Sequence, residues 1–200
     1  NEIMISFLEL FRLYISHHEN STDLFEKRKP GTIRAYNAKY TLVSSFLLEH
    51  KLISAKAIDF DLKMSKLLNE WLLMKKYSHN YIVRVREICK SVLQHGAVSE
   101  LIKSNPLCLL KLKKAPPKKP SYLNPEEIKR FENYVGNTSR KKRARIMFLI
   151  QLNTAFDYGD FEELKRGHKV TYEGDNYIVK ARNKNGNEAV IPISDLLDEL

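Results

Sequence analysis

The chain has 200 residues, enough to bury a hydrophobic core in one or two domains. Its 34 lysines and arginines outnumber 24 aspartates and glutamates, and the formal charge of +10 favours a polyanionic partner, either nucleic acid or an anionic membrane surface. No apolar run approaches the ~20 residues of a membrane span, and the N-terminus does not read as a signal peptide. Two cysteines outside any metal spacing make a disulfide framework unexpected, so we expect a cytoplasmic protein.

Four amphipathic helices are predicted in the first half of the chain, because apolar residues recur there at helical spacing. Their expected ranges are Glu2 to His18, Thr32 (as N-cap) to about His50, Asp61 to Lys76, and Ser78 to Gly96, with Gly96 as a C-terminal cap. The connections are short and carry no strand pattern. Residues 1–108 are therefore expected to form a four-helix bundle.

A basic, proline-rich segment follows, and residues 109–121 are expected to be a linker. Prolines stiffen such a segment towards about 3.1 Å per residue, so about nine residues would reach roughly 28 Å. That is more than twice the ~12 Å width of a major groove, so the linker could join two domains on different sides of a duplex. An ordinary solvated linker is the alternative.

The second unit, residues 122–200, is expected to be α+β. Asn124-Pro125-Glu126-Glu127 reads as a capping box, and a helix is expected over about Ser139 to Asn153. Thr154-Ala155-Phe156 then predicts a tight corner before a second, acid-started helix. Beyond it, two strands are expected to flank a turn, and a last helix is expected to begin at the end of the chain. These ranges are Tyr177–Arg182 and Glu188–Ile193 around Asn183–Asn187, and Asp195–Leu200 with Ser194 as its cap.

This order of parts resembles the tyrosine recombinase (phage integrase) family. The four-helix half is similar to the family's SAM-like core-binding domain, and the second unit to the first part of its α+β catalytic domain. Thr154 to Asp160 looks like the family motif Thr-Gly-Leu-Arg-x-x-Glu/Asp, and the hairpin with Lys184 before Gly186 looks like the catalytic-lysine hairpin. The resemblance implies a mainly α fold with a small β-hairpin region, duplex DNA as partner, self-assembly on DNA and a nucleoid-associated location. It implies no cofactor, no small-molecule substrate and no membrane partner.

In complete family members a tyrosine attacks the phosphodiester and forms a 3′-phosphotyrosyl link. The resemblance gives Lys184 the role of general acid for the leaving 5′-oxygen. Two departures stand against activity. Asp157 occupies the position of the family's arginine, whose charge would stabilise the transition state, and Arg145 from the preceding helix is our expected substitute. The chain also ends before any His-x-x-Arg box or terminal tyrosine, and Tyr172 and Tyr177 are expected to pack in the strands. We expect no DNA cleavage by this chain alone.

Basic side chains along both halves are the expected DNA ligands, mainly through phosphates. They are Lys27, Arg28, Lys29, Arg34 and Lys39 at the second helix, Arg84, Arg86 and Lys90 on the fourth, Lys113, Lys114, Lys118 and Lys119 in the linker, and the cluster from Arg140 and Lys141 to Arg145. Taken singly, each of these charges is more simply explained as a solvated surface group, and it is the set as a whole that fits duplex binding. Tyr36, Tyr40 and Trp71 could stack on single-stranded bases, but their helical spacing favours the core.

Three functions stay open at this point. The first is a site-specific recombinase or integrase without its nucleophile in this chain, and the second is a non-catalytic DNA-binding regulator on the same fold, which Asp157 favours. The third is a helical protein-interaction module, which would not bind DNA. A reading frame that continues past Leu200 with His-x-x-Arg and a tyrosine would support the first.

Asp157, Asp160 and Glu163 could also hold metals for a nuclease, although no distant carboxylate cluster completes such a site. Phosphate-loop, Cys-x-x-Cys and HExxH motifs are absent from the sequence.

Overall fold

The computed structural model describes residues 5–117, 119–194 and 197. The chain divides into two compact units, Asn1–Lys118 and Lys119–Leu200. The architecture is mostly helical with one small antiparallel sheet, as the sequence predicts. Within the described ranges, no helix has the length and apolar character needed to cross a membrane.

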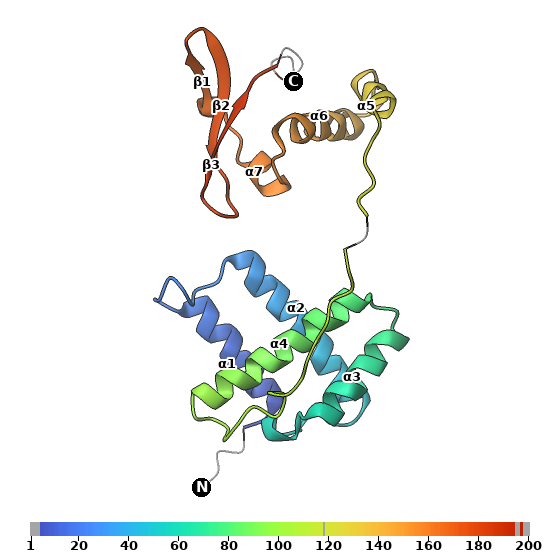
Figure 1. Ribbon diagram of the computed structural model, residues 1–200, viewed down its shortest axis with the longest axis vertical. Coiled ribbons are helices and arrows are strands. Elements are labelled where there is room, and N and C mark those ends of the chain that lie inside the picture. Colours follow the sequence, from blue (N-terminus) through green and yellow to red (C-terminus); the bar gives the residue numbers. More distant parts are fainter. Residues whose placement is uncertain (1–4, 118, 195–196, 198–200) are drawn as a thin grey trace. The chain divides into compact units, whose positions relative to one another are not determined.

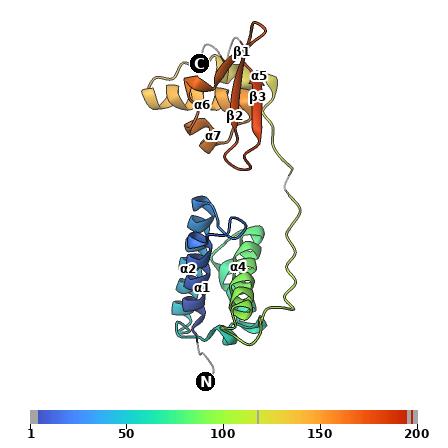
Figure 2. The same ribbon diagram turned by 90° about the vertical axis from the view of Figure 1, so that its left-hand side faces the viewer.

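The first unit is a four-helix bundle (Figure 1). Its helices are α1 (Phe7–Asn20), α2 (Pro30–Glu49), α3 (Leu62–Met74) and α4 (His79–Val98), with a short 3-10 turn, η1 (Ala57–Asp59), before α3. Figure 2 shows α1, α2 and α4 running side by side. Phe7 and Phe60 are fully buried and stack with ring centroids 4.0 Å apart, so the apolar stripes form one core.

Two of the predicted helix starts are wrong. Helix α1 begins at Phe7, where the Ser6 hydroxyl caps it by accepting a hydrogen bond from the Glu9 amide at 3.2 Å; the expected start at Glu2 lies outside the described residues. Helix α2 begins at Pro30 rather than after Thr32. Proline suits the first helical turn because the amide it lacks would have had no partner there, and this signal outweighs the threonine.

The prediction that Gly96 caps α4 is wrong, because this residue lies inside the helix. A Cβ atom at this position would lie 2.7 Å from Cδ2 of Leu10, closer than real carbon contacts allow. The glycine is therefore needed for the close approach of α1 and α4.

Part of the expected linker is bound to α4. Asn80, in the first turn of α4, accepts a hydrogen bond from the Ala115 amide at 2.8 Å and donates to the Ala115 carbonyl at 3.4 Å. Lys90 donates from Nζ to the carbonyls of Cys108 and Leu110, both at 2.9 Å. The chain is thus held along α4 as far as Ala115, and the free spacer is shorter than the sequence indicates.

The second unit begins with helices α5 (Pro125–Glu132), α6 (Ser139–Thr154) and α7 (Tyr158–Glu162), followed by the 3-10 turn η2 (Arg166–His168). The predicted capping box is confirmed. The Glu127 amide donates to Asn124 Oδ1 at 2.9 Å, and the Asn124 amide donates to Glu127 Oε2 at 2.8 Å.

A three-stranded antiparallel sheet completes the second unit, in the order β1 (Lys169–Tyr172), β2 (Asp175–Ala181) and β3 (Glu188–Pro192). The pairing of β2 with β3 is the predicted hairpin. Strand β1 was not predicted, because its four residues are all exposed and show no apolar face. A small core of Phe156 and Ile178 joins the corner to the sheet. The expected last helix lies outside the described residues except for Leu197, whose amide donates to Ser194 Oγ at 3.3 Å.

Candidate functional site

The corner between α6 and α7 is as tight as the sequence predicts. Ala155 adopts a left-handed conformation with φ 52° and ψ 25°, and Phe156 is buried behind it. The Thr154 hydroxyl donates to the Ile150 carbonyl at 2.7 Å and accepts from the Phe156 amide at 3.3 Å. These bonds fix the direction in which the chain leaves α6.

Asp157, the departure from the family motif, caps α7. Its Oδ1 accepts a hydrogen bond from the Asp160 amide at 3.0 Å. A carboxylate suits this place because the first amides of a helix lack partners and carry partial positive charge. The local structure therefore explains why the chain tolerates an acid here.

Asp160 joins the corner to the hairpin. Its side chain is almost completely buried, and Oδ1 accepts a hydrogen bond from the Asn183 amide at 2.7 Å and lies 3.5 Å from Nζ of Lys180. The Asn183 amide, and after it Lys180, hold the pKa of Asp160 below its usual value. The carboxylate is thus ionised at neutral pH and bound to the residue that precedes Lys184.

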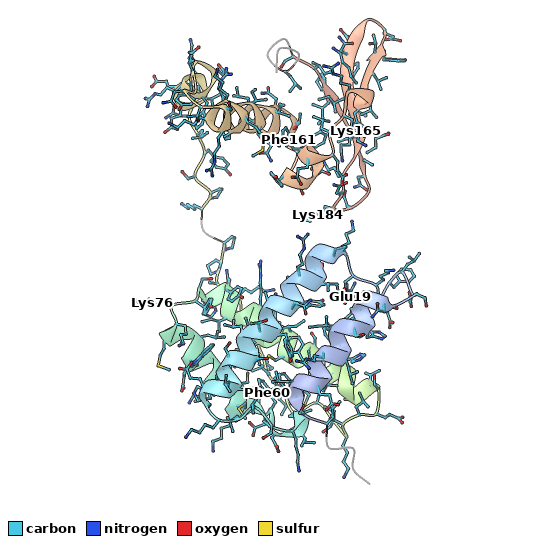
Figure 3. All side chains as sticks on the ribbon, turned by 180° about the vertical axis from the view of Figure 1, so that it is seen from behind. Glu19, Phe60, Lys76, Phe161, Lys165 and Lys184 are labelled. Atoms are coloured by element: carbon cyan, nitrogen blue, oxygen red, sulfur yellow. The ribbon has the colours of Figure 1, made fainter. Side chains whose placement is uncertain are left out.

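Lys184 lies in the exposed loop between β2 and β3, where Figure 3 labels it. The loop is closed by the Arg182 amide, which donates to the Asn187 carbonyl at 2.9 Å, and by Gly186, whose φ of 75° suits glycine. The hydrogen bond between Asp160 and Asn183 brings this loop next to the corner, so the two motifs behind the family resemblance lie together. Catalysis by Lys184 stays a prediction.

Arg145 lies towards the other end of α6. Its Nε donates to the Phe131 carbonyl at 3.0 Å, and its Nη2 donates to the carbonyl of Glu132, at the end of α5. Roughly 14 Å of helix separate it from Thr154 and the corner. Its described role is to cap α5, and its expected role as the substitute arginine stays a prediction that these contacts do not favour.

Lys39 of α2 and Arg84 of α4 lie close enough to interact electrostatically. Partial burial, and then the Arg84 guanidinium, lower the pKa of Lys39. Lys39 Nζ also donates to the Ala35 carbonyl at 3.1 Å. Two cations from different helices repel each other, and a phosphate between them would relieve that repulsion.

Other expected DNA ligands hold the first unit together. Arg86 is half-buried and donates to Ser65 Oγ at 3.0 Å and to Asn69 Oδ1 at 3.2 Å, which joins α4 to α3. Lys90 binds the chain after α4, as described above. Lys114 pairs with Glu87 at 3.1 Å. These three residues have structural partners that a DNA contact would have to displace.

The remaining basic candidates are exposed at element starts and in loops. Arg28 belongs to the loop before α2, where its backbone amide donates to the His18 carbonyl at 2.9 Å and its guanidinium to the Phe25 carbonyl at 3.2 Å. The others in this exposed group are Lys27, Lys29, Arg34, Lys113, Lys119, Arg140 and Lys141, and Lys118 lies outside the described residues. Arg140 and Lys141 open α6, where the helix dipole disfavours cations and favours an anion.

Sequence reasoning missed Lys180, whose side chain is buried beside Asp160. The signal was present: Lys180 lies two residues after the buried Ile178, so strand alternation places both on the inward face of β2. The structure does not favour the alternative of a metal site, because Asp157 caps a helix and the Asp160 carboxylate already binds Asn183 and Lys180. The described part of the chain contains no group of three or more histidine, cysteine, aspartate or glutamate side chains able to hold a metal ion.

No protein-family model and no curated protein matches the chain. Two solved structures are similar to it, both of the Tn1549 transposon integrase in complex with circular intermediate DNA. One, a point variant, gives a TM-score of 0.68 at 14% identity, over 98% of this chain and 63% of that one. The other gives 0.60 at 17% identity, over 98% of this chain and 62% of that one. The chain thus spans less than two thirds of the integrase chains. It has an integrase-like fold, and the resemblance to tyrosine recombinases holds at the level of that fold.

Proposed function

We propose that the chain binds duplex DNA, as the core-binding domain and catalytic corner of a site-specific tyrosine recombinase. The observation that carries the proposal is the match of nearly the whole chain to an integrase solved on DNA. The formal charge of +10 supports a polyanionic partner independently of that match.

Lys39 and Arg84 are the proposed centre of the phosphate contacts in the first unit. They come from two helices packed in one core, so the bundle rather than a loop fixes where their backbones lie. In the second unit, Arg140 and Lys141 contribute cations at the start of α6, where the helix dipole also favours an anion. Contacts of this kind position a duplex and carry little sequence information.

A non-catalytic DNA-binding regulator is the second candidate. The favouring observation is that Asp157 caps α7 while Arg145 is bound to the end of α5. On the recombinase reading, Lys184 protonates the leaving 5′-oxygen and a tyrosine outside this chain is the nucleophile. If the protein is a regulator, the same corner and loop contact the phosphodiester backbone of the DNA without cleaving it.

Fluorescence anisotropy with a labelled duplex tests DNA binding. Lys39→Met and Arg84→Met should each weaken binding about tenfold at low salt, the factor expected for one charge-assisted contact. Lys66→Met removes the same charge from the exposed face of α3 and should leave the affinity within about twofold. Equal losses in all three variants would show that only net charge matters and would refute the assigned contacts.

Asp157→Asn tests whether the corner faces a phosphate, because asparagine retains a capping oxygen and loses the charge. If a phosphate lies near the corner, this change should tighten DNA binding about fivefold, which corresponds to one weak charge repulsion at contact distance in water. Glu126→Gln, in the first turn of α5, is the matched control. Unchanged affinity for Asp157→Asn would place the corner away from the DNA.

A further inference from the structure

A lysine occupies an inward position of strand β2. Lys180 follows Ile178 on the same face, and its side chain is only 5% exposed. An apolar side chain could be buried here without a desolvation penalty. Removing an ammonium group from water costs free energy unless the charge is paired. The lysine therefore needs an explanation beyond filling the core.

The contacts of Lys180 join three segments. Its Nζ lies 3.5 Å from Asp160 Oδ1 in α7 and 3.6 Å from Glu163 Oε2 just after that helix. It also donates to the Ala181 carbonyl at 3.2 Å and lies 3.5 Å from Asn183 Oδ1. One buried cation thus holds the end of β2, the entry of the following loop and the corner helix together.

Asp160 completes the arrangement from the other side. The oxygen that faces Lys180 also accepts the Asn183 amide at 2.7 Å. Removing the ammonium would leave a buried carboxylate with one partner fewer. Removing the carboxylate would leave a buried cation whose remaining counter-ion, among the described residues, is the largely exposed Glu163. The two charges are therefore retained together or lost together.

We propose that Lys180 is a positioning residue that, with Asp160, fixes the β2–β3 loop against the corner and so sets the place of Lys184. Lys184 directly follows Asn183, the loop residue that both charges contact, so a shift of Asn183 displaces Lys184 as well. The role of Lys184 at a DNA phosphate rests on the proposed function. The fixing of the loop does not.

Amide hydrogen exchange of the full chain tests the fixing of the loop without DNA. The paired substitution Lys180→Met with Asp160→Asn removes both charges and leaves side chains of similar size, so the unit stays folded. The Asn183 amide should exchange about tenfold faster, because the neutral asparagine oxygen is a weaker acceptor than the carboxylate that it replaces. The amides of β1 should be unchanged, and Lys169→Met, an exposed lysine of β1, should alter neither these amides nor that of Asn183. Unchanged exchange at Asn183 would overturn the proposal.

A mutant cycle on DNA affinity tests the link to Lys184. Lys184→Ala should weaken binding about tenfold in the unmodified chain and less than twofold when Lys180 and Asp160 are already replaced. An equal loss in both backgrounds would show that the pair does not position Lys184. Failure of the unmodified chain to bind DNA would refute the proposed function alone, because the exchange experiment still decides whether the loop is fixed.

Discussion

Ala155 should be a strained residue, and replacing it with glycine should stabilise the second unit. Its φ of 52° and ψ of 25° lie in the left-handed region, which costs a residue with a Cβ atom about 1–2 kcal/mol. Glycine removes this cost but adds about 0.4–1 kcal/mol of entropy to the unfolded chain. The methyl group of Ala155 is exposed, so its loss uncovers little apolar surface. The net gain from Ala155→Gly should be about 0.5–1 kcal/mol.

Native-state hydrogen exchange at the Ile178 amide, in the core of the second unit, measures this effect. The gain should slow exchange through unfolding about two- to fivefold. Ala155→Val is the opposing variant, because a β-branched side chain is least tolerated at positive φ, and it should speed exchange at least fivefold.

The chain supplies an internal control for the same experiment. Trp71 is the single tryptophan and lies buried in α3 of the first unit. Its fluorescence midpoint in urea should not move in either variant. Faster exchange at Ile178 in Ala155→Gly than in the unmodified chain would refute the strain argument. A shifted Trp71 midpoint would show that the change acts beyond the corner.

Three further outcomes are expected. Asn105 is buried and makes three hydrogen bonds, so Asn105→Ala should destabilise the first unit by about 2–4 kcal/mol in urea titrations followed by Trp71 fluorescence; a loss below about 0.5 kcal/mol would contradict this. A thiol reagent at pH 8 should label the exposed Cys108 at once and Cys89 only after denaturation, because burial raises the Cys89 pKa to about 12; two rapid labels would be inconsistent with the fold. The lowered pKa of Asp160 means that its ionised form stabilises the folded unit. That contribution is complete above about pH 4, the unfolded pKa, and is lost as pH falls through the lower folded pKa. Asp160→Asn should remove this part of the acid sensitivity, which the exchange of the Ile178 amide between pH 5 and 2 would measure. The same pH profile in the variant and in the unmodified chain would refute this prediction.

Local sequence signals predicted most of the elements because their causes are local. The capping box at Asn124 and the corner at Ala155 each depend on residues within one helical turn, and both were placed correctly. Gly96 was misread for the opposite reason. Its role is to admit Leu10 from another helix, and such a contact has no signature in the neighbouring sequence.

Only part of the candidate site could be predicted from the sequence, because the other part depends on contacts between segments that are distant in the chain. The family resemblance pointed to Lys184 and to the charge of Asp157, which are single positions in recognisable motifs. The joining of Asp160 to Lys180 and Asn183 depends on how α7 packs against β2, and this is settled only by the fold. Arg145 shows the same limitation of local reasoning. We expected it near the corner because the chain reverses direction there, but it lies towards the start of α6 and binds the end of α5 instead.

The most direct test of the account is the salt dependence of binding between the full chain and a duplex. Each released counterion contributes to the slope, so log K should fall by roughly five to eight for each tenfold increase in salt. Arg84→Met should reduce that slope by about one, as expected when one phosphate contact is lost. A flat salt dependence, or no binding at low salt, would contradict the proposal that this integrase-like chain binds DNA.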